Sequence, residues 1–265
     1  MNASTQIFSI SEEEFNSYAL DLFRYQAEQV AVYKMYLAHL QVDVTTIHEI
    51  QAIPFLPISF FKTSVILDQV KKDDMHMFQS SGTTGQIPSI HYVSDLALYE
   101  QSFLEGFSHF FGSPSRYVIL ALLPSYLERG HSSLVYMVQK LIHESGHIQS
   151  GFYLDQMEEL ADTIKQMEEQ QQPVLLFGVT YALLDFAAQF PMPLQHTCLI
   201  ETGGMKGRRR ELPRMAVHDI LKKAFGLKQI ASWSLGLWEM VGRQSPRVNL
   251  IQKFVQRPRG SSHLG

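Results

Sequence analysis

The sequence predicts an α/β fold in which a mostly parallel β-sheet is flanked by helices. Two continuous apolar runs, residues 117–123 and 174–177, are typical of strands buried on both faces, as strands of parallel sheets are. Between and after these runs, apolar residues recur with helical periodicity, so that strands and helices alternate along the chain. Such alternation favours a parallel sheet whose strands are connected by helices.

The N-terminal segment is predicted to be helical. Ser11 and Glu14 have the Ser-x-x-Glu spacing of a capping box, in which each side chain accepts a hydrogen bond from the other residue's backbone. Apolar residues then recur at helical spacing as far as about Leu40, which indicates one or two helices. Pro54 and Pro57 disfavour a helix and indicate an extended segment.

The later elements follow from apolar periodicity and from the glycine and proline residues that end it. Helices are predicted over residues 96–111, 132–143, 156–172, 181–190 and 212–224. Strands are predicted over residues 75–78, 117–123, 148–154, 174–177 and 196–200. The chain is accordingly divided into an N-terminal helical segment (1–50), an α/β domain (51–242) and a basic tail (243–265) that is expected to be partly disordered.

Composition bounds the class of protein. Of the 265 residues, 45% are hydrophobic and 18% are charged, and the formal net charge is −4. These values are ordinary for a soluble globular protein and give no case for binding nucleic acid. The single cysteine, Cys198, excludes an intramolecular disulfide and fits a reducing compartment. No secretory signal and no membrane-spanning apolar run are recognised, so we expect a cytoplasmic protein.

The most informative motif is a loop of glycine and hydroxyl residues that follows the predicted strand 75–78. It consists of Ser80, Ser81, Gly82, Thr83, Thr84 and Gly85. Glycines let a backbone approach a ligand closely, hydroxyls donate hydrogen bonds, and successive exposed N–H groups form an anion site suited to polyphosphate. The loop is not a Walker A motif, because Gln86 and Ile87 stand where that motif has Lys and Ser or Thr. A plain surface turn is the alternative.

These six residues, followed by Pro88, resemble the phosphate loop of adenylate-forming enzymes. Residues 53–62 are similar to the stretch before that loop in acyl-protein synthetases, the ATP-dependent subunits of bacterial fatty-acid reductase. A second glycine loop of that group is similar to Glu201, Thr202, Gly203, Gly204, Met205, Lys206 and Gly207. The resemblance covers about residues 53–230. It implies the large N-terminal domain of adenylate-forming enzymes, with ATP and Mg²⁺ as cofactors and a carboxylic acid, first of all a fatty acid, as substrate.

The resemblance also implies roles for individual residues. Backbone N–H groups of the first loop, with the hydroxyls of Ser80, Ser81, Thr83 and Thr84, would hold the ATP phosphates, and Thr84 would take part in catalysis. The loop Glu201-Thr202-Gly203-Gly204 would pack on adenine and ribose; a glycine turn without a ligand is the alternative. From its charge, and not from the resemblance, Lys206 is a candidate to meet a phosphate; a solvated basic face is the alternative.

Two further residues have roles implied by the same resemblance. His131 lies where the acyl substrate approaches in the family and would steer its carboxylate, unless it is simply a surface histidine. Gly236 and Glu239 match a Tyr-Gly-x-Thr-Glu motif in which Glu holds magnesium. Leu235 and Trp238 replace the Tyr and the Thr of that motif.

The resemblance leaves the final reaction open. Superfamily members continue into a C-terminal lid with a catalytic lysine, and acyl-protein synthetases carry an acyl-accepting cysteine near their C-terminus; we expect both to be missing or truncated here. Cys198 is expected to be a core residue. The candidate functions are acyl transfer to a protein thiol on a reductase partner, ligation to coenzyme A, and nucleotide binding by a catalytically incomplete scaffold.

A competing motif is His143-Glu144-Ser145-Gly146-His147, which satisfies the H-E-x-x-H pattern of zinc proteases. That chemistry needs both histidines on one helical face. Gly146 is expected to end the preceding helix, and residues 148–154 are expected to form a strand, which would separate the histidines. A zinc metalloprotease is therefore the remote alternative.

Overall fold

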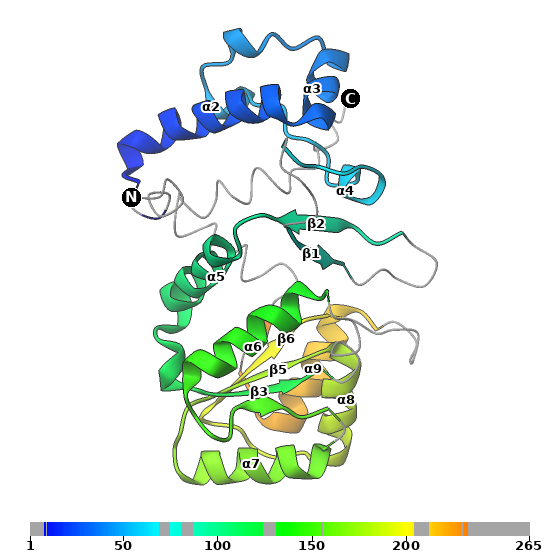
Figure 1. Ribbon diagram of the computed structural model, residues 1–265. Coiled ribbons are helices and arrows are strands. Elements are labelled where there is room, and N and C mark those ends of the chain that lie inside the picture. The colour runs from blue at the N-terminus through cyan, green and yellow to red at the C-terminus, as the bar shows by residue number, and fades with distance from the viewer. Residues whose placement is uncertain are drawn as a thin grey trace. The chain divides into compact units, whose positions relative to one another are not determined.

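The computed structural model describes residues 8, 10–68, 75–80, 87–123, 131–154, 156–203, 212–228 and 230–232 (Figure 1). The described chain divides into two compact units, which we call the N-terminal unit (through residue 102) and the sheet unit (from residue 103). The division falls inside helix α5 (Leu96–Phe111). Each unit has its own cluster of buried apolar side chains.

The described part of the N-terminal unit contains two helices near its start, as predicted: α2 (Glu12–Gln29) and α3 (Ala31–His39). The capping box is confirmed, because Glu14 N donates to Ser11 Oγ at 3.3 Å and Ser11 N donates to Glu14 Oε2 at 3.0 Å. The backbone N–H and the hydroxyl of Ser11 both donate to Glu14 Oε2 and thereby lower the pKa of Glu14. The buried residues of this unit's cluster are Phe23, Ala27, Val30, Tyr33, Leu37 and Ile53.

Short elements follow α3. They are the 3₁₀ turns η1 (Val44–Thr46) and η2 (Ile50–Ala52) and the one-turn helix α4 (Phe60–Thr63), which was not predicted. The segment around Pro54 and Pro57 lies outside regular secondary structure, in agreement with the expected break. Tyr33 fastens this segment to α3, because its hydroxyl donates to Pro54 O at 2.8 Å.

A β-hairpin follows in the N-terminal unit, before the first part of α5. Strand β1 (His76–Gln79) confirms the strand predicted over 75–78, and it pairs antiparallel with β2 (Ile90–Val93), which was not predicted. The register pairs His76 with Val93 and Gln79 with Ile90. The glycine and hydroxyl loop is therefore the connection between two antiparallel strands.

The sheet unit contains the predicted parallel sheet. Its strands are β3 (Val118–Leu122), β4 (Gly151–Phe152), β5 (Val174–Gly178), β6 (Thr197–Glu201) and β7 (Ala231–Ser232), in the spatial order β4-β3-β5-β6-β7. All four neighbouring pairs are parallel. Every residue of β3 and β5 is buried, which explains their uninterrupted apolar sequences.

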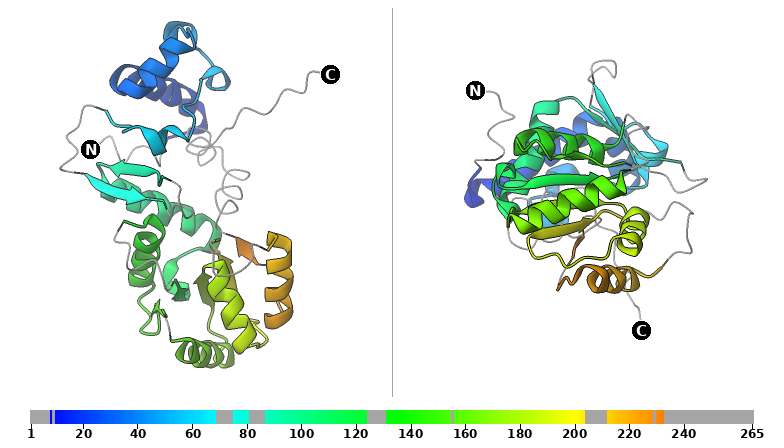
Figure 2. Two further views of the ribbon diagram at one scale, coloured as in Figure 1. Left: turned by 90° about the vertical axis from the view of Figure 1, so that its right-hand side faces the viewer. Right: turned by 90° about the horizontal axis from the view of Figure 1, so that it is seen from below.

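Helices cover both faces of this sheet. They are the last part of α5 together with α6 (Ser133–Ser145), α7 (Met157–Glu169), α8 (Thr180–Gln189) and α9 (Arg214–Phe225). Figure 2 shows α6 on one face and α8 and α9 on the other. This follows from the strand order, because the connections β3–β4 and β5–β6 run in opposite directions across the sheet and right-handed crossovers then place their helices on opposite faces.

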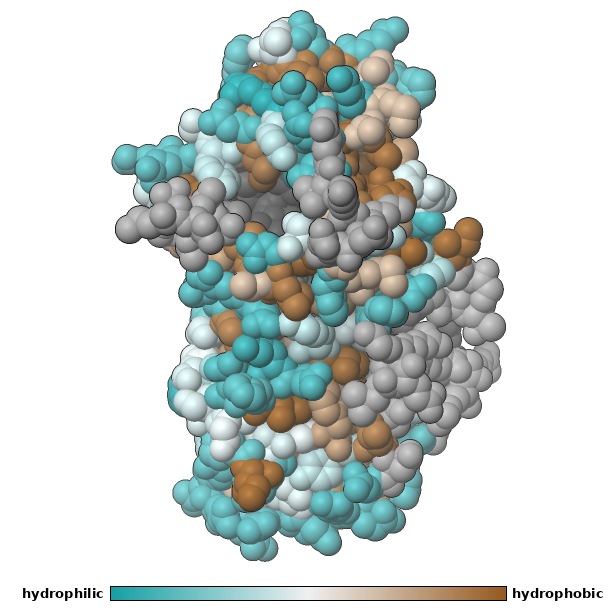
Figure 3. Space-filling view, viewed as in Figure 1, coloured by the Kyte–Doolittle hydropathy of each residue, from teal (hydrophilic) through white to brown (hydrophobic). Residues whose placement is uncertain are grey.

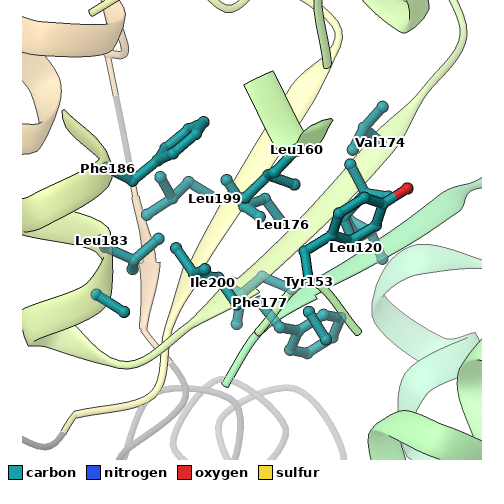
Figure 4. Close-up of a cluster of buried hydrophobic side chains, with 14 of the residues drawn as sticks. Leu120, Tyr153, Leu160, Val174, Leu176, Phe177, Leu183, Phe186, Leu199 and Ile200 are labelled. Atoms are coloured by element: carbon teal, nitrogen blue, oxygen red, sulfur yellow. The ribbon is translucent and has the colours of Figure 1, made fainter. Parts of the chain in front are cut away.

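The core of the sheet unit is shared by strands and helices. Figure 4 shows Leu176 of β5 and Leu199 of β6 in one cluster with Leu160 of α7 and Phe186 of α8. The outer face of α7 is polar, and hydrophilic residues cover the region of the molecule where α7 lies (Figure 3). The amphipathic sequence of residues 156–172 predicts this arrangement.

One predicted strand is wrong in extent. Residues 148–154 were expected to be extended, but only Gly151 and Phe152 pair with β3. Ser150 N donates to His147 O at 3.1 Å, so the chain turns first, and Ile148 is 94% exposed in that turn. Within the described residues, no helix is both long and apolar enough to cross a membrane.

Candidate functional site at the carboxyl edge of the sheet

The carboxyl ends of three neighbouring strands lie in line. The register places Leu122 of β3 beside Gly178 of β5, and Gly178 beside Glu201 of β6. The strand order also reverses between β3 and β5, because the chain continues from β3 to β4 on one side of this point and from β5 to β6 on the other side. Ligands of open α/β sheets bind outside the carboxyl ends of strands at such a reversal. This edge is therefore the candidate site of the sheet unit.

Glu201 is the central residue of this edge. It ends β6 and is only 3% exposed. Its Oε1 accepts a hydrogen bond from Gly203 N at 2.8 Å and another from the hydroxyl of Thr180, the first residue of α8. Gly203 has a φ of 78°, in the left-handed region that glycine adopts without strain. The Glu201 carboxylate is thus buried, and it is hydrogen-bonded to the loop that follows β6.

Backbone hydrogen bonds join the ends of β5 and β6 at the same place. Thr202 donates to Gly178 O from its N at 3.0 Å and from its Oγ1 at 3.1 Å. Thr180 N donates to Gly203 O at 3.2 Å. Both backbone polar groups of Gly203 are consequently engaged, the N–H by Glu201 and the carbonyl by Thr180.

Two basic side chains of α9, an arginine and a histidine, face the second oxygen of this carboxylate. Arg214 Nε and His218 Nε2 each lie 3.9 Å from Glu201 Oε2. They are one helical turn apart and therefore share a face of α9. His218 Nε2 is buried and has no hydrogen-bond partner among the residues that the structure describes. Sequence analysis missed Thr180, Arg214 and His218 as part of this group.

The predicted phosphate loop begins in the N-terminal unit. Ser80 N donates to Ser89 O, and Ser89 N donates to Ser80 Oγ, both at 2.9 Å. This reciprocal pair extends the ladder of β1 and β2 and fixes the two ends of the loop. Among the described residues, Ser80 Oγ acts as an acceptor, which leaves its O–H able to donate to a further partner. Ser81, Gly82, Thr83, Thr84 and Gly85 lie outside the described residues.

Of the other predicted site residues, the structure describes His131. It is exposed and directly precedes Ser132, whose hydroxyl caps α6 by accepting from Val135 N at 3.4 Å. Glu201, Thr202 and Gly203 are brought together at the carboxyl edge of the sheet, as described above. Gly204, Lys206, Gly236 and Glu239 lie outside the described part of the chain.

The H-E-x-x-H segment has the helix end that its glycine predicts. Helix α6 stops at Ser145, and Gly146 follows in the left-handed conformation with a φ of 67°. His147 lies beyond the helix, and its Nε2 donates to Ser115 O at 3.0 Å. Across the described ranges, no cluster of three or more His, Cys, Asp or Glu residues is arranged to hold a metal ion.

Cys198 lies in β6 and is half-buried against the hydrophobic core of the sheet unit, so its assignment as a core residue holds in part. Burial raises the pKa of its thiol, so the reactive thiolate is disfavoured.

Comparisons of this chain with protein-family models, with curated proteins and with solved structures found no match. The site and the fold define an α/β protein with a glycine loop at the carboxyl edge of a parallel sheet.

Proposed function

We propose that this protein is an ATP- and Mg²⁺-dependent carboxylate-activating enzyme of the acyl-protein synthetase type. The observation that carries the proposal is the glycine and hydroxyl sequence from Ser80 to Gly85, which lies in the sequence between β1 and β2, where Ser80 and Ser89 are hydrogen-bonded to each other. A loop with fixed ends loses less conformational freedom on binding an anion. The O–H that Ser80 keeps is of the right type to donate to a phosphate oxygen.

The second unit supplies supporting features. Glu201 ends a buried strand of a parallel sheet and Thr202 and Gly203 follow it, at the edge where nucleotides and other ligands bind in such folds. We assign adenine and ribose to this loop and to Gly204, and phosphate to the first loop and Lys206. Gly236 and Glu239 are assigned to the magnesium-binding motif, Thr84 to phosphate contact during the reaction, and His131 to steering the acid.

The proposed reaction has two steps. An oxygen of the substrate carboxylate attacks the α-phosphorus of ATP, pyrophosphate leaves, and a thiol of a partner protein then takes the acyl group as AMP leaves. Bound Mg²⁺ would neutralise the charge on the phosphate oxygens. The role of this chain's own residues is to orient the phosphates through backbone N–H and hydroxyl donors and to stabilise the anionic transition state.

The decisive experiment is ATP–pyrophosphate exchange, measured with acids from acetate to long-chain fatty acids and with aryl acetates. We expect exchange with one class of acid. Ser80→Ala should raise the KM for ATP by about tenfold or more, the effect of losing a hydrogen bond to a charged group. Ser17→Ala, which changes an exposed serine of α2, is the control and should leave the KM unchanged.

The other outcomes separate the alternatives. Nucleotide binding without exchange for any acid, in folded protein, would favour the catalytically incomplete scaffold. Thioester formation with free coenzyme A would favour a coenzyme A ligase. A failure to bind ATP with Mg²⁺ in calorimetry would contradict the proposal, and stoichiometric zinc in elemental analysis would revive the metalloprotease.

A further inference from the structure

We propose that Thr180 is a positioning residue for the nucleotide loop of the sheet unit, and that it acts through the buried carboxylate of Glu201. Thr180 is 5% exposed and is the first residue of α8, two residues after the end of β5. It is distant in sequence from the loop that it positions. The inference rests on the proposed function, in which residues 201–204 receive adenine and ribose.

The contacts of Thr180 converge on a single residue of that loop. Its N donates to Gly203 O at 3.2 Å, and its hydroxyl donates to Glu201 Oε1. That same oxygen accepts from Gly203 N at 2.8 Å. Thr180 therefore braces the carbonyl of Gly203 directly and its N–H through Glu201. With φ at 78°, Gly203 has no side chain of its own to restrict the loop, so the bracing must come from neighbours.

The use of a buried carboxylate in this group of hydrogen bonds indicates that it positions the loop and does not serve packing alone. A carboxylate that is 3% exposed is costly to bury unless donors surround it, and apolar side chains hold strand ends together as well or better. Here Oε1 receives the two donors already named, and Oε2 faces Arg214 and His218 at 3.9 Å. This charged group lies at the carboxyl edge, next to the reversal in strand order where ligands bind.

The sheet contains a matched control. Thr197 is also 5% exposed, and its hydroxyl also donates to a glutamate, Glu168. Thr197 begins β6, however, and so lies at the edge of the sheet opposite to Thr180. Thr180→Val and Thr197→Val each replace a buried donor by a methyl group of similar volume. Both substitutions should lower thermal stability. A difference in ligand binding between the two variants therefore reports on where each threonine lies in the sheet and not on stability.

The test measures the Kd for Mg²⁺–ATP by calorimetry, at a temperature where all variants are folded. Thr180→Val should raise the Kd by about tenfold, Thr180→Ser should bind within about twofold of the unchanged protein, and Thr197→Val should leave the Kd unchanged. Equal affinity of Thr180→Val and Thr197→Val would overturn the proposal. If Thr180→Val does not fold, Glu201→Gln replaces it, because its neutral oxygen accepts from the same two donors more weakly.

A second measurement separates this proposal from the proposed function. Amide hydrogen exchange at Gly203, in protein without ligand, should be faster in Thr180→Val than in Thr197→Val, because only the first variant removes a donor from the carboxylate that Gly203 N–H contacts. If the unchanged protein does not bind ATP, the proposed function fails, while faster exchange at Gly203 still supports Thr180 as the residue that positions the loop. Equal exchange rates in the two variants would overturn the positioning role.

Discussion

Glu168, in the last turn of α7, accepts a 2.7 Å hydrogen bond on Oε1 from the hydroxyl of Thr197, the first residue of β6. The same carboxylate accepts from Gln195 N at 2.8 Å and from His196 N at 3.0 Å. One side chain of α7 therefore satisfies three donors in the segment that leads into a central strand. Removing it would leave these donors without their acceptor.

We predict that Glu168→Ala lowers the free energy of unfolding by about 1–3 kcal/mol, the usual effect of leaving partly buried donors unsatisfied. Urea denaturation measures the change. Glu169→Ala is the matched control, because Glu169 is the next residue of α7 and its side chain is exposed. Equal stabilities of the two variants would show that the Glu168 hydrogen bonds contribute nothing.

A second prediction concerns two glycines for which alanine should have opposite effects. A Cβ on Gly178 would lie 2.5 Å from Cδ2 and 2.6 Å from Cγ of the buried Leu183, so α8 would have to move away from the sheet. Gly178→Ala should cost about 1–3 kcal/mol. A Cβ on Gly106, inside α5, meets nothing within 4 Å, and Gly106→Ala should stabilise by about 0.5–1 kcal/mol. Thermal unfolding of both variants tests the signs, and a destabilised Gly106→Ala would contradict the second.

The third prediction is a pH dependence that originates at His91. Its ring stacks on Phe61 with centroids 4.3 Å apart, and burial lowers its pKa. Because the unfolded chain then takes up the proton more readily than the folded one, stability contributed here is present above about pH 6.5 and is lost as the pH falls below it. His91→Phe keeps an aromatic ring against Phe61 and removes the titration.

We therefore expect the melting temperature of the unchanged protein to fall more steeply between pH 7.5 and 5 than that of His91→Phe. His39→Phe, at an exposed position of α3, serves as the control and should keep the steeper dependence. Parallel pH profiles for the unchanged protein and for His91→Phe would mean that His91 does not contribute.

The fourth prediction uses the only cysteine of the chain. Because Cys198 packs against the core and burial raises the pKa of its thiol, alkylation by iodoacetamide at pH 7.5 should be at least about tenfold slower in the folded protein than in urea. Mass spectrometry of the modified protein follows the rate. A folded-state rate close to that in urea would place the thiol at the surface and reopen its assignment as a core residue.

Sequence reasoning predicted the elements that carry their own pattern. The apolar runs that became β3 and β5 are buried along their whole length, and Gly146 and Gly226 end α6 and α9 in the left-handed conformation. It missed β2 and β7, which have four and two residues and are defined mainly by the strand that each pairs with.

The candidate site was predicted in part for a similar reason. Glycine marks the loop at Glu201–Gly203 in the sequence, but Thr180 joins it only because β5 and β6 pair in one register. A threonine two residues after the glycine that ends a buried strand was the available signal, since that position reaches the carboxyl edge of a parallel sheet. Arg214 and His218 depend on how α9 packs, which no local pattern encodes.

The common direction of the five strands has a consequence for protein engineering. Every strand of this sheet begins at the edge where Glu168 accepts a hydrogen bond from Thr197 and ends at the edge where Glu201 accepts one from Thr180. We expect substitutions at the first edge to act on stability alone, and substitutions at the second to act also on the loop proposed to bind a ligand. A library that varies ligand choice could therefore be built on a background stabilised at the opposite edge, with few positions shared between the two aims.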